Sequence, residues 1–335
     1  MTRKMLSAAT AVALLFAAGP LGVTPAMAEP AVVYDAGGKF DKSFNEAAYN
    51  GIEKYKTDSG DSYAEFEVQT DAQREQAFRR MAQRGADPVI GIGFSQAPAL
   101  EKVAKEFPDR HFAIIDMVVD LPNVQSIVFK EHEGSFLVGM LAAMASKSAK
   151  VGFVGGMDIP LIRRFACGYA QGAKYANPDI AVTENMTGTT PAAWNDPTKG
   201  AELAKGQFDA GVDVIFAAAG GTGSGVYQAA KDAGKFAIGV DSNQNHLHPG
   251  TMLTSMLKRV DVAVYDSAMA AKEGKWNAGI TELGLAQDGV GWALDEHNAS
   301  LITDDMKAKV EAAKADIISG KIAVHDYMAD NSCQL

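Results

Sequence analysis

The sequence predicts an α/β protein of two doubly wound lobes, and three observations support this class. Short apolar, β-branched runs alternate with longer amphipathic stretches, which is the pattern of βαβ units around a parallel sheet. The same order of runs occurs twice along the chain. The chain also has 335 residues, which is more than one hydrophobic core usually organises. We therefore expect two domains.

The first βαβ unit runs from an apolar strand at 31–34, through an amphipathic helix at 43–55, to a strand at 66–68. Further buried strands are expected at 88–92, 112–115, 151–154, 212–217 and 236–240. At least one helix-like segment separates each strand from the next, so a doubly wound parallel sheet follows. The tail contains a hairpin or crossing strand at 283–294 and a helix at 305–318, and the pattern alone does not assign it to a lobe.

The second half of the chain repeats the first. Residues 80–90 and residues 206–216 share the pattern of a helix end, a glycine turn and an apolar strand. One helix later, each half has an apolar strand that leads to an aspartate, Asp116 or Asp241. Ligands of open α/β sheets bind beyond the carboxyl ends of the strands, so two facing lobes bring both carboxylates to a common cleft. The alternative is a pair of solvated helix-capping aspartates.

The first 28 residues have the features of a secretion signal. Two basic residues precede an apolar run at 5–18, and Ala-Met-Ala at 26–28 gives a small-residue cleavage pattern. The run is too short to span a bilayer, and no later segment approaches about 18 continuous apolar residues. Glu29 stands where a lipid-anchored protein has cysteine. We therefore expect a free periplasmic protein with no membrane insertion.

The net charge limits the possible partners, and the two cysteines allow a disulfide. The net charge of −10 argues against nucleic acid and against an anionic membrane as partners, and it favours a neutral or cationic ligand. Cys167 and Cys333 are the only cysteines. In an oxidising compartment they either form one disulfide or stay unlinked, and the sequence leaves both alternatives open.

The parts of a catalytic site are missing from the sequence pattern. The glycine-rich loop at 220–225 follows a strand and opens a helix, but Val226 replaces the third glycine of the dinucleotide fingerprint and no P-loop lysine follows. Gly220 and Gly221 therefore either offer N–H donors to a ligand or form a purely structural turn. His246 and His248 lie in a loop and do not indicate a metal site. We expect no cofactor, no metal and no enzymatic activity, and an enzyme remains the rival class.

Several residues at strand ends suit recognition of a flat ring. Asp35 ends the first strand, and Phe44 and Asn45 start the next helix. Trp194 lies in a loop of the second half, and Phe94 ends another strand of the first. The alternatives are a core anchor or hydrophobic staple for Phe44 and packing over a loop base for Trp194.

Six motifs occur in order along the chain: Asp-Lys-Ser-Phe-Asn at 41–45, Phe-Ala-Ile-Ile-Asp at 112–116, Glu-Gly-Ser-Phe-Leu-Val-Gly at 133–139, Lys-Val-Gly-Phe-Val-Gly-Gly-Met at 150–157, the strand at 236–241, and Thr-Ser-Met-Leu-Lys at 254–258. Together they resemble the basic membrane protein family, whose members are nucleoside-binding lipoproteins and solute receptors of ABC importers. The missing lipid-anchor cysteine is a departure from the family.

The resemblance implies a type I periplasmic-binding-protein fold, in which two Rossmann-like lobes are joined by a hinge. It further implies a purine base stacked between aromatic side chains, with Phe44 on one face and Trp194 placed on the other. Asp35 and Asn45 would form hydrogen bonds from the first lobe, and Asp116 would address the base edge.

The resemblance also implies a ribose site. Asp241 would accept hydrogen bonds from both ribose hydroxyls, with Lys258 and the Gly220 and Gly221 backbone nearby. The expected partner is an ABC permease of the inner membrane, which recognises the closed monomer. The same cleft could instead serve a sugar, an aromatic acid or a signalling compound.

The predicted first lobe comprises 29–146 and about 254–282, and the second comprises 147–253 and about 283–335. Interlobe crossings are expected near 144–150, 251–258 and 283. Three crossings form a hinge of limited freedom.

Overall fold

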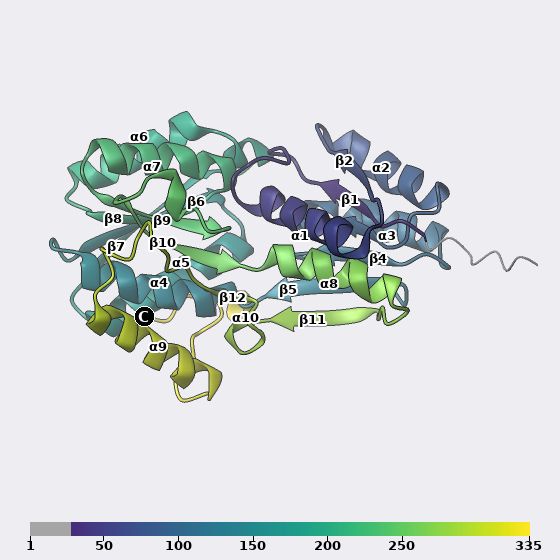
Figure 1. Ribbon diagram of the computed structural model, residues 1–335. Helices are drawn as coiled ribbons and strands as arrows, with labels where there is room; N and C mark the ends of the chain where they lie inside the picture. The colour runs from purple at the N-terminus through teal and green to yellow at the C-terminus, as the bar shows by residue number, and fades with distance from the viewer. Residues whose placement is uncertain (1–27) are drawn as a thin grey trace, which may run out of the picture.

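A computed structural model describes residues 28–335 of the protein. The predicted signal segment lies, apart from its last residue, outside the described residues. Figure 1 shows two lobes side by side, each a sheet with helices on both faces. Every helix in the described part falls short of the length and apolar character that a membrane crossing needs.

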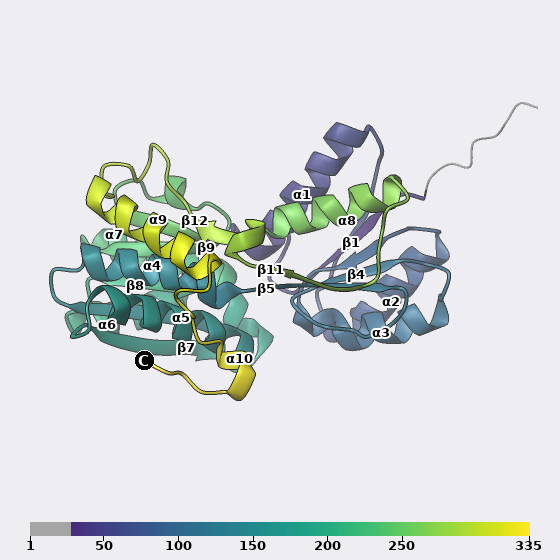
Figure 2. The same cartoon turned by 90° about the horizontal axis from the view of Figure 1, so that it is seen from below.

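The first lobe is built on a six-stranded sheet with the order β11-β5-β4-β3-β1-β2, in which all neighbouring strands are parallel. Its strands are β1 (Ala31–Tyr34), β2 (Ala64–Glu67), β3 (Val89–Gly91), β4 (Phe112–Ile115), β5 (Val124–Phe129) and β11 (Gly279–Leu283). Its helices are α1 (Phe44–Ser59), α2 (Asp71–Gln83), α3 (Ala97–Glu106) and α8 (Val260–Lys272). Helices α1 and α8 pack together on one face of the sheet, and α2 and α3 cover the other (Figure 2).

The second lobe repeats this plan with the order β12-β10-β9-β8-β6-β7, and only the edge strand β12 is antiparallel. Its strands are β6 (Lys150–Met157), β7 (Ala181–Gly188), β8 (Val214–Ala218), β9 (Phe236–Asp241), β10 (Met252–Lys258) and β12 (Val290–Trp292). Its helices are α4 (Glu131–Ala145), α5 (Pro160–Ala176), α6 (Pro197–Asp209), α7 (Gly223–Asp232), α9 (Asp304–Ile318) and α10 (Tyr327–Asp330). The two doubly wound α/β lobes confirm the predicted fold class.

The chain passes between the lobes at three places: between β5 and α4, between β10 and α8, and after β11. The structure therefore differs from the predicted boundaries, which put α4 and part of β10 in the first lobe. Helix α4 instead packs on α5, β10 and β12 of the second lobe. The boundary was predicted wrongly because α4 is buried on almost all sides, so its apolar pattern does not indicate which sheet it covers.

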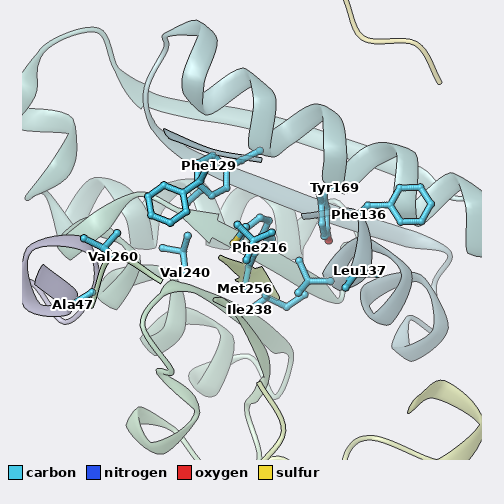
Figure 3. Close-up of a cluster of buried hydrophobic side chains, with 14 of the residues drawn as sticks. Ala47, Phe129, Phe136, Leu137, Tyr169, Phe216, Ile238, Val240, Met256 and Val260 are labelled. Atoms are coloured by element: carbon cyan, nitrogen blue, oxygen red, sulfur yellow. The ribbon is translucent and has the colours of Figure 1, made fainter. Parts of the chain in front are cut away.

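The largest core cluster lies between sheet and helices of the second lobe and continues into the first. Figure 3 shows Phe216, Ile238 and Met256 of the sheet facing Leu137 of α4 and Tyr169 of α5. Close packing of the two helices requires a glycine, because a Cβ at residue 139 would lie 2.1 Å from the Tyr169 carbonyl oxygen. This closely packed α4–α5 pair supports one wall of the interlobe cleft.

Candidate ligand-binding site

A cavity lies between the lobes at the carboxyl ends of the strands, where the duplication predicted it. Side chains from both lobes line it, which is the usual place of a small-molecule site in a two-lobed α/β protein. All the predicted ligand residues except Gly221 line it: Asp35, Phe44, Asn45, Phe94, Asp116, Trp194, Gly220, Asp241 and Lys258. Gly221 lies instead against the Trp194 carbonyl oxygen, within the turn.

Aromatic side chains reach the cavity from both lobes. Phe44 begins α1, and Phe94 begins a 3₁₀ turn after β3. From the second lobe, Trp194 ends the 3₁₀ turn Pro191–Trp194, with its indole packed on the backbone of Gly156. The cavity is therefore lined by aromatic side chains from both lobes, which a stacked planar ligand requires.

The first two turns of α5 supply a wall that sequence reasoning missed. Leu161, Ile162 and Phe165 line the cavity. These residues read as ordinary core positions of an amphipathic helix. The signal that could have found them is the place of α5, whose first turn follows the carboxyl end of β6 and so faces the cleft.

Asp116 and Asp241 occupy equivalent places in the two lobes. Asp116 directly follows β4 and Asp241 ends β9, and both have a left-handed backbone, with φ of 70° and 63°. Aspartate is one of the few non-glycine residues that tolerate this conformation. Burial raises the pKa of each carboxyl to about 6. One oxygen of Asp116, Oδ1, is buried without a hydrogen-bond partner among the described residues, so it is available to a ligand.

Lys258 supplies the positive charge of the cavity. Its Nζ lies 2.6 Å from Asp116 Oδ2 and 2.9 Å from Glu131 Oε1. The rings of Phe44 and Phe165 lie 5.2 and 5.5 Å from the same nitrogen, within range of a cation–π contact. Burial opposes the charge of Lys258, but the carboxylates of Asp116 and Glu131 raise its pKa above the ordinary value. The ammonium therefore stays protonated.

Asp35 and Asn45 line the cavity, but their polar groups hold the loop that follows β1. The Asp35 carboxylate accepts hydrogen bonds from the Ala36 amide at 2.7 Å, from Arg74 Nη2 at 2.8 Å and from the Ser95 hydroxyl. The Asn45 side chain accepts from the Asp35 amide at 3.1 Å and donates to Asp41 at 3.2 Å. Their predicted hydrogen bonds to a ligand stay predictions.

Sequence reasoning also missed Asp41, which lines the cavity and organises the start of α1. Its carboxylate accepts hydrogen bonds from the amides of Ser43, Asn45 and Glu46 at 2.8, 3.0 and 3.1 Å. This is the usual way to satisfy free amides at a helix start. Asp41 thereby fixes Phe44, the first helical residue, at the edge of the cavity.

Direct hydrogen bonds close the lobes on one another beside the cavity. The Ser43 hydroxyl donates to Asp241 Oδ2 at 2.5 Å, and the Ser242 hydroxyl donates to the Ser43 carbonyl at 3.0 Å. Gln244 Nε2 donates to the Lys42 carbonyl at 2.7 Å. The structure is thus that of a closed cleft.

The remaining candidates lie away from the cavity. Cys167 of α5 and Cys333 are joined by a disulfide, with Cα atoms 5.5 Å apart, which decides between the two alternatives left open by the sequence. In residues 28–335, the one group with metal-ligand spacing is Asp295–His297, on a loop of the second lobe. His246 and His248 do not belong to it.

The geometry agrees with what known proteins show. Residues 28–327 match the family described as ABC transporter substrate-binding protein, PnrA-like (Bmp). The chain belongs to this family. It is thus a member of a family of solute-binding proteins and not of enzymes, as the sequence predicted.

Individual relatives of this Bmp family protein cover most of its length. A CD4+ T-cell-stimulating antigen of Listeria monocytogenes is 38% identical over 88% of this chain and 87% of its own. The ABC transporter nucleoside-binding protein BmpA of Lactococcus lactis is 35% identical over 92% of each chain. The crystal structure of an ABC transporter solute-binding protein from Aeropyrum pernix matches with a TM-score of 0.82 and 31% identity, over 88% of this chain and 92% of that one. The last comparison confirms the periplasmic-binding-protein fold.

Proposed function

We propose that this protein captures a nucleoside, with purines favoured, and delivers it as a monomeric periplasmic receptor to the permease of an ABC importer. The observation that supports this most is the interlobe cavity, which has aromatic side chains on both lobes around two buried carboxylates. A nucleoside needs both features, because its base is flat and its ribose has neighbouring hydroxyls.

The energetics favour a neutral nucleoside. Stacking on an aromatic ring contributes about 1–3 kcal/mol per base, and a hydroxyl that donates to a carboxylate forms a charge-assisted hydrogen bond. The carboxylates of Asp116, Asp241 and Glu131 surround the single ammonium of Lys258. A phosphate group would meet this negative surplus, so nucleotides are disfavoured.

The relative from Lactococcus lactis is named for nucleoside binding, and this supports carrying the ligand class over to the present chain. Ligand binding to both lobes stabilises the closed form, which gives the permease a distinct state to recognise.

The discriminating experiment replaces Phe44 by alanine. Nucleoside affinity should fall at least tenfold, because one stacking face is lost, whereas a sugar held by hydrogen bonds would be almost unaffected. The matched control is Phe40→Ala in the loop that leads into α1, since Phe40 is 60% exposed and does not line the cavity.

Calorimetry measures both variants. A Phe44→Ala protein that is folded and keeps wild-type nucleoside affinity would contradict the proposed stacking and point to the sugar-type alternative. A loss of equal size in Phe40→Ala would show that the loop, rather than the ring, determines binding.

A further inference from the structure

A buried chain of alternating charges leads from the cavity to the C-terminal tail. Asp116 Oδ2 contacts Lys258 Nζ at 2.6 Å, and the same nitrogen contacts Glu131 Oε1 at 2.9 Å. Glu131 Oε2 accepts a hydrogen bond from Arg164 Nη1 at 2.9 Å. The other edge of the Arg164 guanidinium donates to both oxygens of Asp326, at 2.7 and 2.6 Å. We call these five residues the charge chain.

The middle of the charge chain lies where the polypeptide passes between the lobes. Glu131 is the first residue of α4 after the crossing from β5, and Lys258 is the last residue of β10 before the crossing to α8. Arg164 Nη1 also donates to the carbonyl of Phe129, the last residue of β5, at 2.7 Å. The charge chain therefore connects two of the three hinge segments.

The far end of the charge chain belongs to a tail that is fixed on α5. Asp326 caps α10 by accepting a hydrogen bond from the Met328 amide at 2.9 Å. Next to it, the His325 amide and carbonyl pair with the Gln171 side chain at 2.8 and 2.9 Å. The disulfide from Cys333 to Cys167 holds the end of the tail on the same helix.

The three middle residues of the charge chain, Lys258, Glu131 and Arg164, each have two partners of opposite charge, and this pairing compensates for the cost of burying them. The side chains of Lys258 and Glu131 are only 2% and 1% exposed. Removing one member leaves its neighbour under-compensated, which is costly away from water. Without Asp326, Arg164 has only Glu131 as carboxylate partner, so it draws Glu131 away from Lys258. Lys258 then relies more on Asp116, the carboxylate that faces the ligand.

We propose that Arg164 and Asp326 are positioning residues for ligand capture, which act through Glu131 to hold Lys258 at the cavity and make the disulfide-linked tail part of the binding machinery. The expected effect of these residues on ligand affinity rests on the proposed nucleoside function. Their effect on the charge of the cavity is independent of the ligand and can be tested separately.

The test compares Asp326→Asn with Asp330→Asn. Asparagine at 326 retains an oxygen that can cap α10 and removes only the charge opposite Arg164. Asp330 lies in the same short helix, and its carboxylate contacts His325 and Ser332 rather than Arg164. Two quantities are measured: nucleoside affinity by calorimetry, and the titration of the Asp116 carboxyl by carbon NMR without ligand, assigned with Asp116→Asn.

In Asp326→Asn, nucleoside affinity should fall about fivefold at pH 7.5, because Lys258 competes with the ligand for Asp116. The uncompensated Arg164 charge should also lower the pKa of Asp116. Lys258, Glu131 and Asp241 face Asp116 in all variants, so a difference between the variants originates in the lost Asp326 charge and reaches Asp116 through these groups. Asp330→Asn should leave both quantities unchanged.

An unmoved Asp116 titration in Asp326→Asn, or an equal shift in Asp330→Asn, overturns the charge-chain proposal. A shifted titration with wild-type nucleoside affinity overturns its role in capture. If the wild type binds no nucleoside, the proposed function fails, and the titration alone then decides whether the tail acts on the cavity.

Discussion

The position of the Trp194 indole depends on a glycine that does not line the cavity, and this permits an indirect test of stacking. A Cβ at residue 156 would lie 2.1 Å from Trp194 Cζ3 and 2.4 Å from Cε3. Real Cβ atoms essentially never approach another atom within 3.0 Å, so Gly156→Ala requires the indole and the residue 156 backbone to separate by at least 0.9 Å (3.0 − 2.1). A gap of about 1 Å already loses about a quarter to a half of the dispersion attraction.

Stacking on one ring contributes about 1–3 kcal/mol, and 1.4 kcal/mol corresponds to about a tenfold change in affinity. Losing a quarter to a half of this energy weakens nucleoside binding by roughly two- to tenfold, which is the result we expect for Gly156→Ala in calorimetry, at unchanged far-UV circular dichroism. The matched control is Gly206→Ala in α6 of the same lobe, where an added Cβ meets no described atom within 4 Å. It should retain wild-type affinity.

A folded Gly156→Ala protein with nucleoside affinity within twofold of wild type would exclude the Trp194 indole as a stacking wall. An equal loss in Gly206→Ala would exclude displacement of Trp194 as the cause, since that change leaves Trp194 in place.

Three further predictions concern charge, closure and the tail. Burial raises the pKa of Asp116 and Asp241 to about 6, and the ligand needs the ionised form of both carboxyls. Ligand affinity should therefore fall as the pH decreases below 6, by up to about tenfold per pH unit for each carboxyl. A flat calorimetric profile from pH 7.5 to 5 would contradict their role as acceptors. Ser242→Ala removes one interlobe hydrogen bond, and stopped-flow should detect roughly two- to tenfold faster ligand release. The control Ser224→Ala, which removes a hydrogen bond to Gly221 within one lobe, should release ligand at the wild-type rate. Equal release rates in both variants would show that the Ser242 hydrogen bond does not contribute to closure. Replacing both cysteines by serine should lower the free energy of unfolding by about 2–4 kcal/mol in denaturant titration, and a loss well below about 1 kcal/mol would contradict a stabilising disulfide.

The alternating pattern predicted both parallel sheets, and the duplication predicted where their ligand-facing edges meet. Asp116 and Asp241 were predictable because a strand followed by aspartate recurs at the same place in each half. The strands β5, β7, β10 and β11 were not singled out. Much of β7 and β11 is exposed, so neither forms the buried apolar run that marks a strand.

The hydrogen-bond partners within the site could not be predicted from sequence. The Asp35 carboxylate is engaged by Arg74 and Ser95, which are 39 and 60 residues away along the chain. Only the folded arrangement reveals these contacts. Likewise, the pattern of α5 alone marks Phe165 as a core residue, and only the arrangement of the two lobes shows that it lines the cavity. The charge chain ends on a tail whose sequence pattern indicated no lobe.

Nucleoside capture is tested most simply by calorimetric titration of refolded, ligand-free protein with adenosine, guanosine, inosine, uridine, ribose and a nucleotide. Refolding removes a tight ligand that survives purification. We expect micromolar or tighter binding of at least one nucleoside, with no detectable binding of ribose or the nucleotide. If the protein is demonstrably folded and binds none of the nucleosides, it is not a nucleoside receptor.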